Sequence, residues 1–148
     1  MSGLIATPVG ALGLDGAEAL TAVHFGRAGD LRDGALFAAA TEQLQGYFAG
    51  ERRDFDLPLD LGSGFRADFL RALLAIPYGE TRTYGDLARA LGVSAQAIGQ
   101  ACGANRLPVI VPCHRVLGAS GLGGYSGAGG VETKVALLRL EGAGGLLI

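Results

Sequence analysis

The stretch "TYGDLARALGVSAQAIGQACG", from Thr83 to Gly103, predicts two short helices joined by a tight turn. Thr83 is a good N-cap for the first helix, and Asp86 three residues later completes a pattern like a capping box. Gly92 ends that helix, and Ser94 caps the second one. Two helices joined in this way form the helix-turn-helix pattern of many DNA-binding proteins, although many helical hairpins share it and bind nothing.

The second of these helices is slim. Small residues occupy five of its positions: Ala95, Ala97, Gly99, Ala101 and Gly103. A glycine inside a helix costs about 1 kcal/mol relative to alanine, so this composition needs a reason. Two explanations stay open: close packing against a neighbouring helix, or entry into the minor groove of DNA, which is only about 6 Å wide.

A further helix is expected just before this pair. In "SGFRADFLRALLAI", four apolar side chains recur on one helical face: Phe65, Phe69, Leu73 and Ile76. The next residues, "PYGETRTYG", form a loop that leads to the N-cap at Thr83. The second part of the chain is therefore predicted to be mainly helical.

The first part of the chain predicts a small sheet and a helix. Residues 3–26, "GLIATPVGALGLDGAEALTAVHFG", have the pattern of two or three short strands with glycine turns. A helix is expected over residues 34–50, because apolar side chains recur there at helical spacing: Leu36, Ala40, Leu44 and Phe48. The segment 51–62, "ERRDFDLPLDLG", is then an edge strand or a connector.

We place a domain boundary near Gly62, which gives an N-terminal α/β domain, 1–62, and a C-terminal domain, 63–148. Residues 1–65 hold four arginines and nine acidic residues, a net charge of −5, whereas residues 66–148 hold eight basic and five acidic residues, a net charge of +3. A solvated surface explains the basic C-terminal half about as well as a polyanionic partner does.

The composition is that of an ordinary globular protein of one or two compact units, with 148 residues, 49% hydrophobic and 18% charged, and a net charge of −2. No stretch has the apolar length of a membrane span, and the N-terminus has no basic leader. We therefore expect a cytoplasmic protein with no membrane partner. Two cysteines and two histidines without a clustered zinc motif predict no metal site.

The stretch "VIVPCHRVLG", residues 109–118, carries the candidate chemistry. Val109 to Val111 suit a buried strand that Pro112 ends, so Cys113 is expected to emerge at a strand end. A lone cysteine in such a place is most often a small buried hydrophobe. Its neighbours His114 and Arg115 argue for a functional thiol, because a basic neighbour lowers the pKa of a cysteine.

A glycine-rich loop, "GLGGYSGAGG", follows at residues 121–130. Tyr125 and Ser126 are the polar side chains in it. Because glycines let backbone N–H groups come close to a ligand, this loop and Cys113 are predicted to build a polar pocket.

These residues carry a resemblance to a known family. "PCHRV", the preceding "NRLPVIV", the following "GGYSG" and the terminal "LLRLEG" resemble the O6-alkylguanine-DNA alkyltransferases, also called methylated-DNA–protein-cysteine methyltransferases. The resemblance spans the whole chain: "TPVGAL" is similar to the family's opening strand, "YFAGERRDFDLPLDL" to its interdomain segment, and "IPYGETRTYGDLARALG" to the entry of its helix-turn-helix.

The resemblance implies an α/β (α+β) fold. A small β-sheet and helix domain of ribonuclease H-like type would precede a mainly helical, winged helix-turn-helix-like domain that carries the active-site cysteine. It also implies a monomeric repair protein without a cofactor, whose partner is double-stranded DNA that contains alkylated guanine. The damaged base is flipped out of the duplex, and its alkyl group moves irreversibly to Cys113, so that each molecule acts once.

The catalytic residues are implied by the same resemblance. A thiolate is a strong, soft nucleophile for dealkylation at carbon, which is the role of Cys113. Glu141 would orient His114, which reaches Cys113 through a water, and neighbours that point apart on a strand fit such a relay. Tyr84 would push the target phosphate round and donate to a ring nitrogen of the base.

The substrate-binding residues implied by the resemblance are Asn105, Pro108, Val116, Tyr125 and Ser126. Ser126 marks the loop whose backbone N–H meets the guanine oxygen, and Tyr125 and Pro108 wall the alkyl pocket. Asn105 ties the turn to the active-site strand, while the carbonyls of Val116 and the active-site cysteine receive the exocyclic amine.

Plain structural roles compete with some functional ones. Tyr125 is also explained by core filling, Asn105 by structural hydrogen bonds and Arg115 by a buried salt bridge. Cys102 is expected to be inert packing, and His24 a surface or core residue.

The residues expected to contact DNA are Ala95, Gln96, Ala97, Gly99, Gln100 and Arg106. Gln96 stands where the family usually has an intercalating arginine, and glutamine lacks the charge and the planar guanidinium that stacks on bases. Base flipping or DNA affinity should suffer unless Arg82 or Arg106 substitutes. Arg106 itself replaces a usual proline.

Two further departures are a loop from Tyr125 to Lys134 that is two residues longer, and Leu70 in place of a common tryptophan. Two rival functions remain: a DNA-damage binder that transfers the alkyl group weakly or not at all, and a Cys–His thiol hydrolase, which needs a directly paired base.

Overall fold

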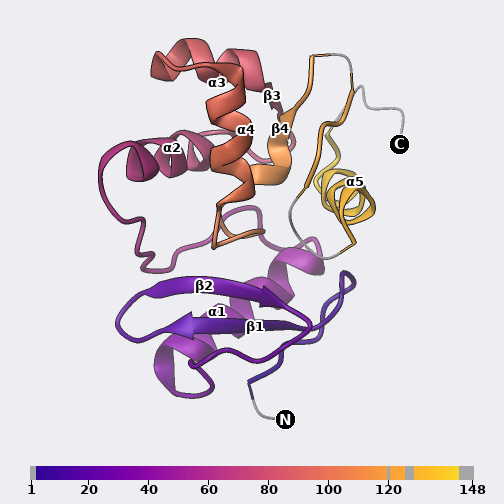
Figure 1. Ribbon diagram of the computed structural model, residues 1–148. Helices are drawn as coiled ribbons and strands as arrows, with labels where there is room; N and C mark the ends of the chain where they lie inside the picture. Colours follow the sequence, from indigo (N-terminus) through magenta and orange to yellow (C-terminus); the bar gives the residue numbers. More distant parts are fainter. Residues whose placement is uncertain (1–2, 120, 126–128, 144–148) are drawn as a thin grey trace. The chain divides into compact units, whose positions relative to one another are not determined.

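The computed structural model describes residues 3–119, 121–125 and 129–143, and the chain forms two compact units, Met1–Asp60 and Leu61–Ile148 (Figure 1). The first unit has a small sheet and a helix, and the second is mainly helical. This mixed α/β architecture confirms the expected fold class. None of the helices within the described residues combines the length and the apolar character needed to cross a bilayer.

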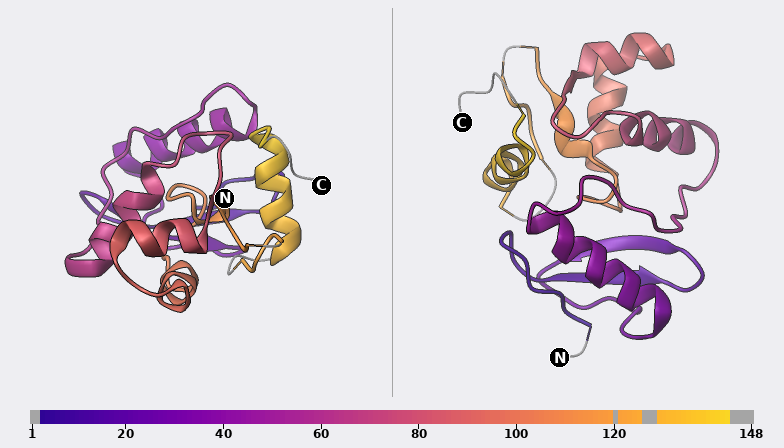
Figure 2. Two further views of the ribbon diagram at one scale, coloured as in Figure 1. Left: turned by 90° about the horizontal axis from the view of Figure 1, so that it is seen from above. Right: turned by 180° about the vertical axis from the view of Figure 1, so that it is seen from behind.

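The first unit is built on a β-hairpin. β1 (Leu12–Gly16) pairs antiparallel with β2 (Leu20–Phe25), with Leu14 opposite Val23. α1 (Gly34–Phe48) lies across one face of the hairpin, as the front view (Figure 1) and the view from behind (Figure 2) show. Both contribute buried side chains: Leu12, Leu14, Leu20, Ala40, Leu44 and Tyr47.

The flanking segments of this unit pair with the hairpin at single bridges. Ile5 bridges Leu12 and Leu59 bridges Leu20. The sequence predicted two or three strands in residues 3–26, and the third one is reduced to the single bridge at Ile5. The segment 51–62 is a connector that touches the sheet edge, because its other backbone groups form no ladder.

The second unit contains, in chain order, α2 (Gly64–Leu74), β3 (Arg82–Thr83), α3 (Tyr84–Leu91), α4 (Ala95–Gly103), the 3₁₀ turn η1 (Cys113–Arg115), β4 (Val116–Leu117) and α5 (Val131–Leu140). β3 and β4 are parallel, with Arg82 opposite Val116. This pairing ties the start of α3 to the residues that directly follow η1.

The helix-turn-helix is confirmed in its local detail. The Thr83 hydroxyl accepts from the Asp86 N–H over 3.0 Å, and the Asp86 carboxylate accepts from the Thr83 N–H over 2.9 Å, which is a complete capping box. Gly92 ends α3 with a φ of 70°. The Ser94 hydroxyl caps α4 by accepting from the Ala97 N–H.

The apolar face of α2 differs from the expectation at its first turn. Phe69 and Leu73 are buried, and so is Ile76, which follows the helix end. Phe65 is 42% exposed and stacks on Phe69 with the ring centroids 6.2 Å apart. The spacing was right, but the core of this unit ends before the first turn of the helix.

The predicted strand over Val109 to Val111 is wrong. These residues form a buried turn, in which the Val111 N–H donates to the Leu107 carbonyl over 2.8 Å. Val109 has a φ of 73°, a conformation that strains a β-branched residue. A run of Val and Ile favours a strand locally, but the core needs only that these side chains be buried.

Candidate active site

The turn before the cysteine is held by Asn105. Its side-chain N–H donates to the Val111 carbonyl over 3.1 Å, and its side-chain oxygen accepts from the Leu107 N–H over 2.9 Å. Both ends of a buried amide are therefore used, which stabilises a turn that contains a strained valine. The turn delivers the chain to Pro112 and then to η1.

Cys113 opens η1 and is 5% exposed. Burial raises the pKa of its thiol, while a hydrogen bond from Asn105 and the charge of Lys134 act in the opposite direction. The expectation that basic neighbours lower the pKa of Cys113 is thus wrong in sign, because the desolvation is larger. The folded protein holds Cys113 as a neutral thiol.

His114 is fully buried beside Glu141. Its Nε2 lies 2.7 Å from the Glu141 carboxylate, and its Nδ1 is buried with no hydrogen-bond partner among the described protein atoms. Burial lowers the pKa of His114, although Glu141 opposes this. Because an ionised carboxylate only accepts, the neutral imidazole carries its proton on Nε2 and has a free lone pair on Nδ1.

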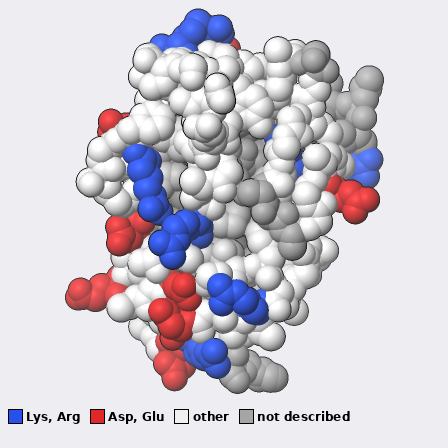
Figure 3. Space-filling model, in the orientation of Figure 1, with Lys and Arg blue, Asp and Glu red and all other residues white. Residues whose placement is uncertain are grey.

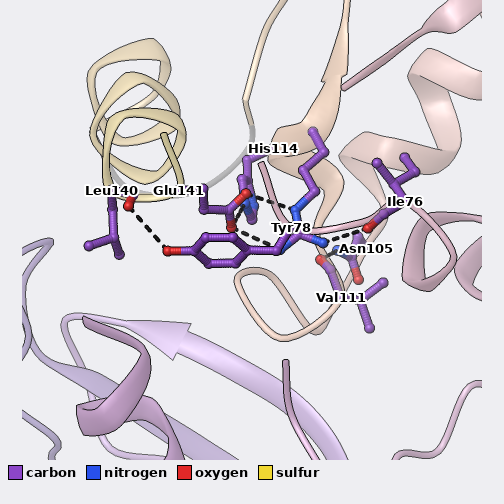
Figure 4. Close-up of polar contacts among 8 residues, drawn as sticks. Ile76, Tyr78, Asn105, Val111, His114, Leu140 and Glu141 are labelled. Atoms are coloured by element: carbon purple, nitrogen blue, oxygen red, sulfur yellow. Dashed lines mark hydrogen bonds and ion pairs between the residues drawn. The ribbon is translucent and has the colours of Figure 1, made fainter. Parts of the chain in front are cut away.

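Glu141 also binds Arg115 through both of its oxygens. Arg115 Nε lies 2.8 Å from Oε1 and Nη2 lies 2.9 Å from Oε2, and Nη1 donates to the Ile76 carbonyl over 2.7 Å. The guanidinium lies 5.8 Å from the ring centroid of Tyr78, whose hydroxyl donates to the Leu140 carbonyl (Figure 4). The buried salt bridge expected for Arg115 is confirmed, and it fixes the carboxylate that holds His114.

A buried lysine organises the loop opposite. Lys134 of α5 is fully buried, and its ammonium donates to the carbonyls of Val116, Leu122 and Gly124. Burial lowers the pKa of Lys134, and the two cysteines oppose this. Lys134 was not among the site residues predicted from the sequence. The available signal was its place two helical turns before Glu141, on the same side of α5.

Residues of α3, α4, η1 and the loop before α5 line a pocket of about 250 Å³. It is lined by Tyr84, Gly99, Cys102, Gly103, Cys113, Gly124 and Tyr125. Burial raises the pKa of the Tyr84 hydroxyl, and the Gly124 N–H donates to it. Gly123, at φ 72°, packs against the same hydroxyl, since a Cβ atom there would come within 2.8 Å of the oxygen.

The pocket brings together some of the expected site residues and leaves out others. Tyr84, Tyr125 and Cys113 line it, and burial raises the pKa of Tyr125. Pro108 and Val116 are buried but do not line the pocket, and Ser126 lies outside the described residues. Three lining residues were not predicted from the sequence as site residues: Cys102, Gly103 and Gly124. Half-buried Cys102 lies in the lining of the pocket, and the expectation that it is inert packing stays a prediction.

The exposed side of α4 fits the second explanation for its small residues better. A Cβ atom added at Gly99 or Gly103 would meet no atom within 4 Å, so close packing does not account for these two glycines. Gln96, Gln100 and Arg106 are exposed. Figure 3 shows a largely uncharged surface over α4 in that view.

His24 and a possible metal site were also considered from the sequence. His24 is half-buried in the first unit, where its Nε2 lies 2.8 Å from the Asp15 carboxylate. Among residues 3–119, 121–125 and 129–143, no three His, Cys, Asp or Glu side chains gather as a metal ion would require.

Both units match domains of one family. Residues 1–61 match the ribonuclease-like domain of 6-O-methylguanine DNA methyltransferase, and residues 64–143 match its DNA binding domain. The methylated-DNA–protein-cysteine methyltransferase of Mycobacterium tuberculosis (strain ATCC 25618 / H37Rv) is 52% identical over 113 residues, which cover 74% of this chain and 67% of that protein. The corresponding protein of Methanosarcina acetivorans is 47% identical over 112 residues, which cover 73% of this chain and 70% of that protein.

Solved structures agree. The crystal structure of Mycobacterium tuberculosis O6-methylguanine methyltransferase superimposes with a TM-score of 0.83 at 42% identity, covering 99% of this chain and 95% of that one. The same organism's protein in complex with DNA has a TM-score of 0.81 at 42% identity, covering 95% of this chain and 92% of that one. With both domains matched in order, and with a cysteine pocket on the second, the chain belongs to the 6-O-methylguanine DNA methyltransferase family.

Proposed function

We propose that the protein repairs alkylated guanine in double-stranded DNA by moving the alkyl group from the guanine O6 to the sulfur of Cys113, once per molecule. The observation that carries this function is a buried thiol that lines a pocket beside the His114–Glu141–Arg115 network. A sulfur nucleophile suits attack on an alkyl carbon, and the thioether that forms has no route back to the thiol.

His114 takes the thiol proton in this proposal. Its free Nδ1 lone pair is the basic position of the imidazole that the described network leaves open, and in this proposal a water relays the proton to it from Cys113. Glu141 stabilises the imidazolium that forms, and Arg115 keeps Glu141 in place. The charge of Lys134 favours the thiolate during attack.

Tyr84 completes the reaction at the base. Because burial raises the pKa of its hydroxyl, Tyr84 is a neutral donor that can hydrogen-bond to a ring nitrogen of the guanine. The new bond joins sulfur to the alkyl carbon, and the bond from that carbon to O6 breaks. The base takes up one proton, so thiol and alkylguanine give thioether and guanine.

The remaining contacts belong to the same proposal. Tyr125 walls the alkyl group, and the Val116 carbonyl accepts a hydrogen bond from the exocyclic amine. That carbonyl already accepts from Lys134, and a carbonyl oxygen has a second lone pair. Asn105 acts through the turn that it holds.

The DNA contact is made by α4, whose small residues suit the narrow minor groove. Ala95, Gln96, Ala97, Gly99 and Gln100 of α4 and the nearby Arg106 form this surface. Gln96 fills the space that the flipped base leaves.

The organisation of the chain and its setting are also proposals. We propose a boundary near Gly62, with a domain over 1–62 and a second over 63–148. Since the thiol of Cys113 must stay reduced, we propose that the protein works in the reducing cytoplasm. We also propose that it is a monomer.

The two alternative functions have less support than alkyl transfer. A damage binder without transfer, which Gln96 suggested, is not favoured, because the relatives near 50% identity are named methyltransferases and Cys113 is present. A thiol hydrolase needs a base paired directly with the nucleophile, and the described residues show no hydrogen bond between His114 and Cys113.

The test is incubation with a duplex that contains one O6-methylguanine, followed by intact mass and peptide mapping. One methyl group per protein, located on Cys113, is expected, with none on the Cys113→Ser variant. Methyl transfer to Cys113→Ser, or repair of more than one equivalent of O6-methylguanine per protein, would refute the proposal.

A further inference from the structure

Both cysteines of the chain open on the same pocket. Cys102 comes from the last turn of α4 and Cys113 from the first residue of η1, and the two belong to the seven residues that line it. Cys102 has no part in the transfer reaction proposed above. Its position beside Cys113 is therefore a feature that this function leaves unexplained.

The two sulfurs share this space as neutral thiols. Burial, followed by the nearby Cys113 sulfur, raises the pKa of Cys102 to about 12, and burial raises the pKa of Cys113. Lys134 favours the thiolate of each. Two thiolates would repel one another, whereas two neutral thiols can sit close together and lose their protons when they bind a common atom.

We propose that Cys102 and Cys113 form a two-sulfur site for trivalent arsenic that carries one organic group. An aryl arsenic(III) oxide reacts with both thiols: two As–S bonds form, the arsenic–oxygen bond breaks, and the two thiol protons leave with the oxygen as one water. Arsenic stays trivalent, so no oxidant or reductant takes part. Sulfur is the ligand that soft centres of this kind prefer.

The pocket has room for the organic group. Its volume of about 250 Å³ exceeds that of a cavity of roughly 150 Å³ that admits benzene. Tyr84 and Tyr125 offer aromatic walls to a phenyl ring, and a Cβ atom added at Gly99 or Gly103 would meet no atom within 4 Å.

The donor set suits arsenic better than a tetrahedral metal ion. Within the part of the chain that the structure describes, no third His, Cys, Asp or Glu joins the two cysteines. A structural zinc ion takes four such ligands, whereas trivalent arsenic with one organic group takes two sulfurs.

Phenylarsine oxide and the native, reduced full-length protein provide the test. Intact mass should show one phenylarsenic group gained and two thiol hydrogens lost. This adduct should survive an excess of the monothiol 2-mercaptoethanol and be removed by the dithiol 1,2-ethanedithiol. Cys102→Ser, Cys102→Ala and Cys113→Ser, each checked for folding by circular dichroism, should lose the adduct to the monothiol.

A second pair of variants tests the folded pocket against capture by an unfolded chain. Gly99→Leu places a side chain in the pocket wall and should slow adduct formation severalfold, whereas Gln100→Leu, exposed on the same helix and outside the pocket, should not. Two phenylarsenic groups per protein, no adduct, equal release from the wild type and the single-cysteine variants, or equal rates for the Gly99 and Gln100 variants would each overturn the proposal. No DNA is present, so failure of alkyl transfer leaves the result unaffected.

Discussion

Glu141 is 4% exposed and accepts hydrogen bonds from both His114 and Arg115. Glu141→Gln keeps the shape of the side chain and removes its charge, so the buried guanidinium loses its counter-ion. Breaking a buried ion pair in this way costs about 3–5 kcal/mol. Urea unfolding should show a loss of this size, together with slower alkyl transfer.

Glu132→Gln is the matched control, because Glu132 is exposed in the first turn of the same helix. Its free energy of unfolding should stay within about 0.5 kcal/mol of the wild type. Similar losses for both variants would mean that the Glu141 network does not stabilise the fold.

Because His114 is buried, we expect the free energy of unfolding to depend on pH. Burial lowers the pKa of His114 in the folded protein, while a histidine in the unfolded chain titrates near about 6.5. Below that pH the unfolded chain binds a proton that the folded protein does not, so the free energy of unfolding falls as pH drops, by up to about 1.4 kcal/mol per pH unit. Asp15 and Asp86, whose pKa values are lowered from 3.8, lose their contributions at more acidic pH.

Urea titrations between about pH 7.5 and about pH 5.5 measure this slope, and the pH values bracket the unfolded histidine. His114→Asn should have a shallower slope than the wild type. An unchanged slope in the variant would assign the pH dependence to other groups.

At the scale of elements, the loop before α5 positions Tyr84. Gly123→Ala puts a Cβ atom 2.8 Å from the Tyr84 hydroxyl at a φ of 72°, so both contact and backbone oppose it. A left-handed conformation alone costs about 1–2 kcal/mol for a non-glycine residue. We expect a lower melting temperature and slower transfer. Gly121→Ala, where no atom lies within 4 Å of the added Cβ, should melt and react like the wild type.

Gln96 on α4 is the position at which a substitution tests base flipping. Gln96→Arg adds a planar, charged group that can stack where the flipped guanine was, so the second-order rate on duplex DNA should rise. The rate with free O6-benzylguanine should stay nearly the same, because a free base needs no flipping. The salt dependence on duplex should steepen if the new charge reaches a phosphate.

Gln100→Arg separates position from charge, since Gln100 is exposed on the same helix. A general electrostatic effect would raise the duplex rate equally in both variants. Equal rates would therefore show that Gln96 does not occupy the position of the intercalating residue, or that Arg82 or Arg106 already fills it.

At the scale of the molecule, the charges are divided unequally. The chain has a net charge of −2, yet residues 66–148, which hold the site, carry +3. Duplex binding should weaken as salt rises, by about 0.9 in log affinity per log unit of salt for each neutralised phosphate. The reaction with free O6-benzylguanine should not respond to salt. A salt-independent rate on duplex would show that the basic unit makes no phosphate contacts.

The local elements were predictable from the sequence. The capping box of Thr83 and Asp86, the end of α3 at Gly92 and the cap at Ser94 depend on residues within one helical turn, so the pattern alone determines them. The PCHRV motif identified Cys113 and the family by resemblance. The apolar run that begins at Val109 led to a wrong strand prediction, because residues buried in a turn and residues buried in a strand have the same apolar pattern.

Only the tertiary structure decided the electrostatics and the walls of the site. Arg115 reaches Glu141 across 26 positions, and Lys134 reaches Val116 across 18, so no local pattern predicts either contact. The placement of Cys102 beside Cys113, and the raised pKa of both thiols, likewise depend on α4 and η1 enclosing one pocket. Caps and periodicity act within a few residues, whereas desolvation and charge pairing depend on which distant segments meet, and that is a property of the folded chain.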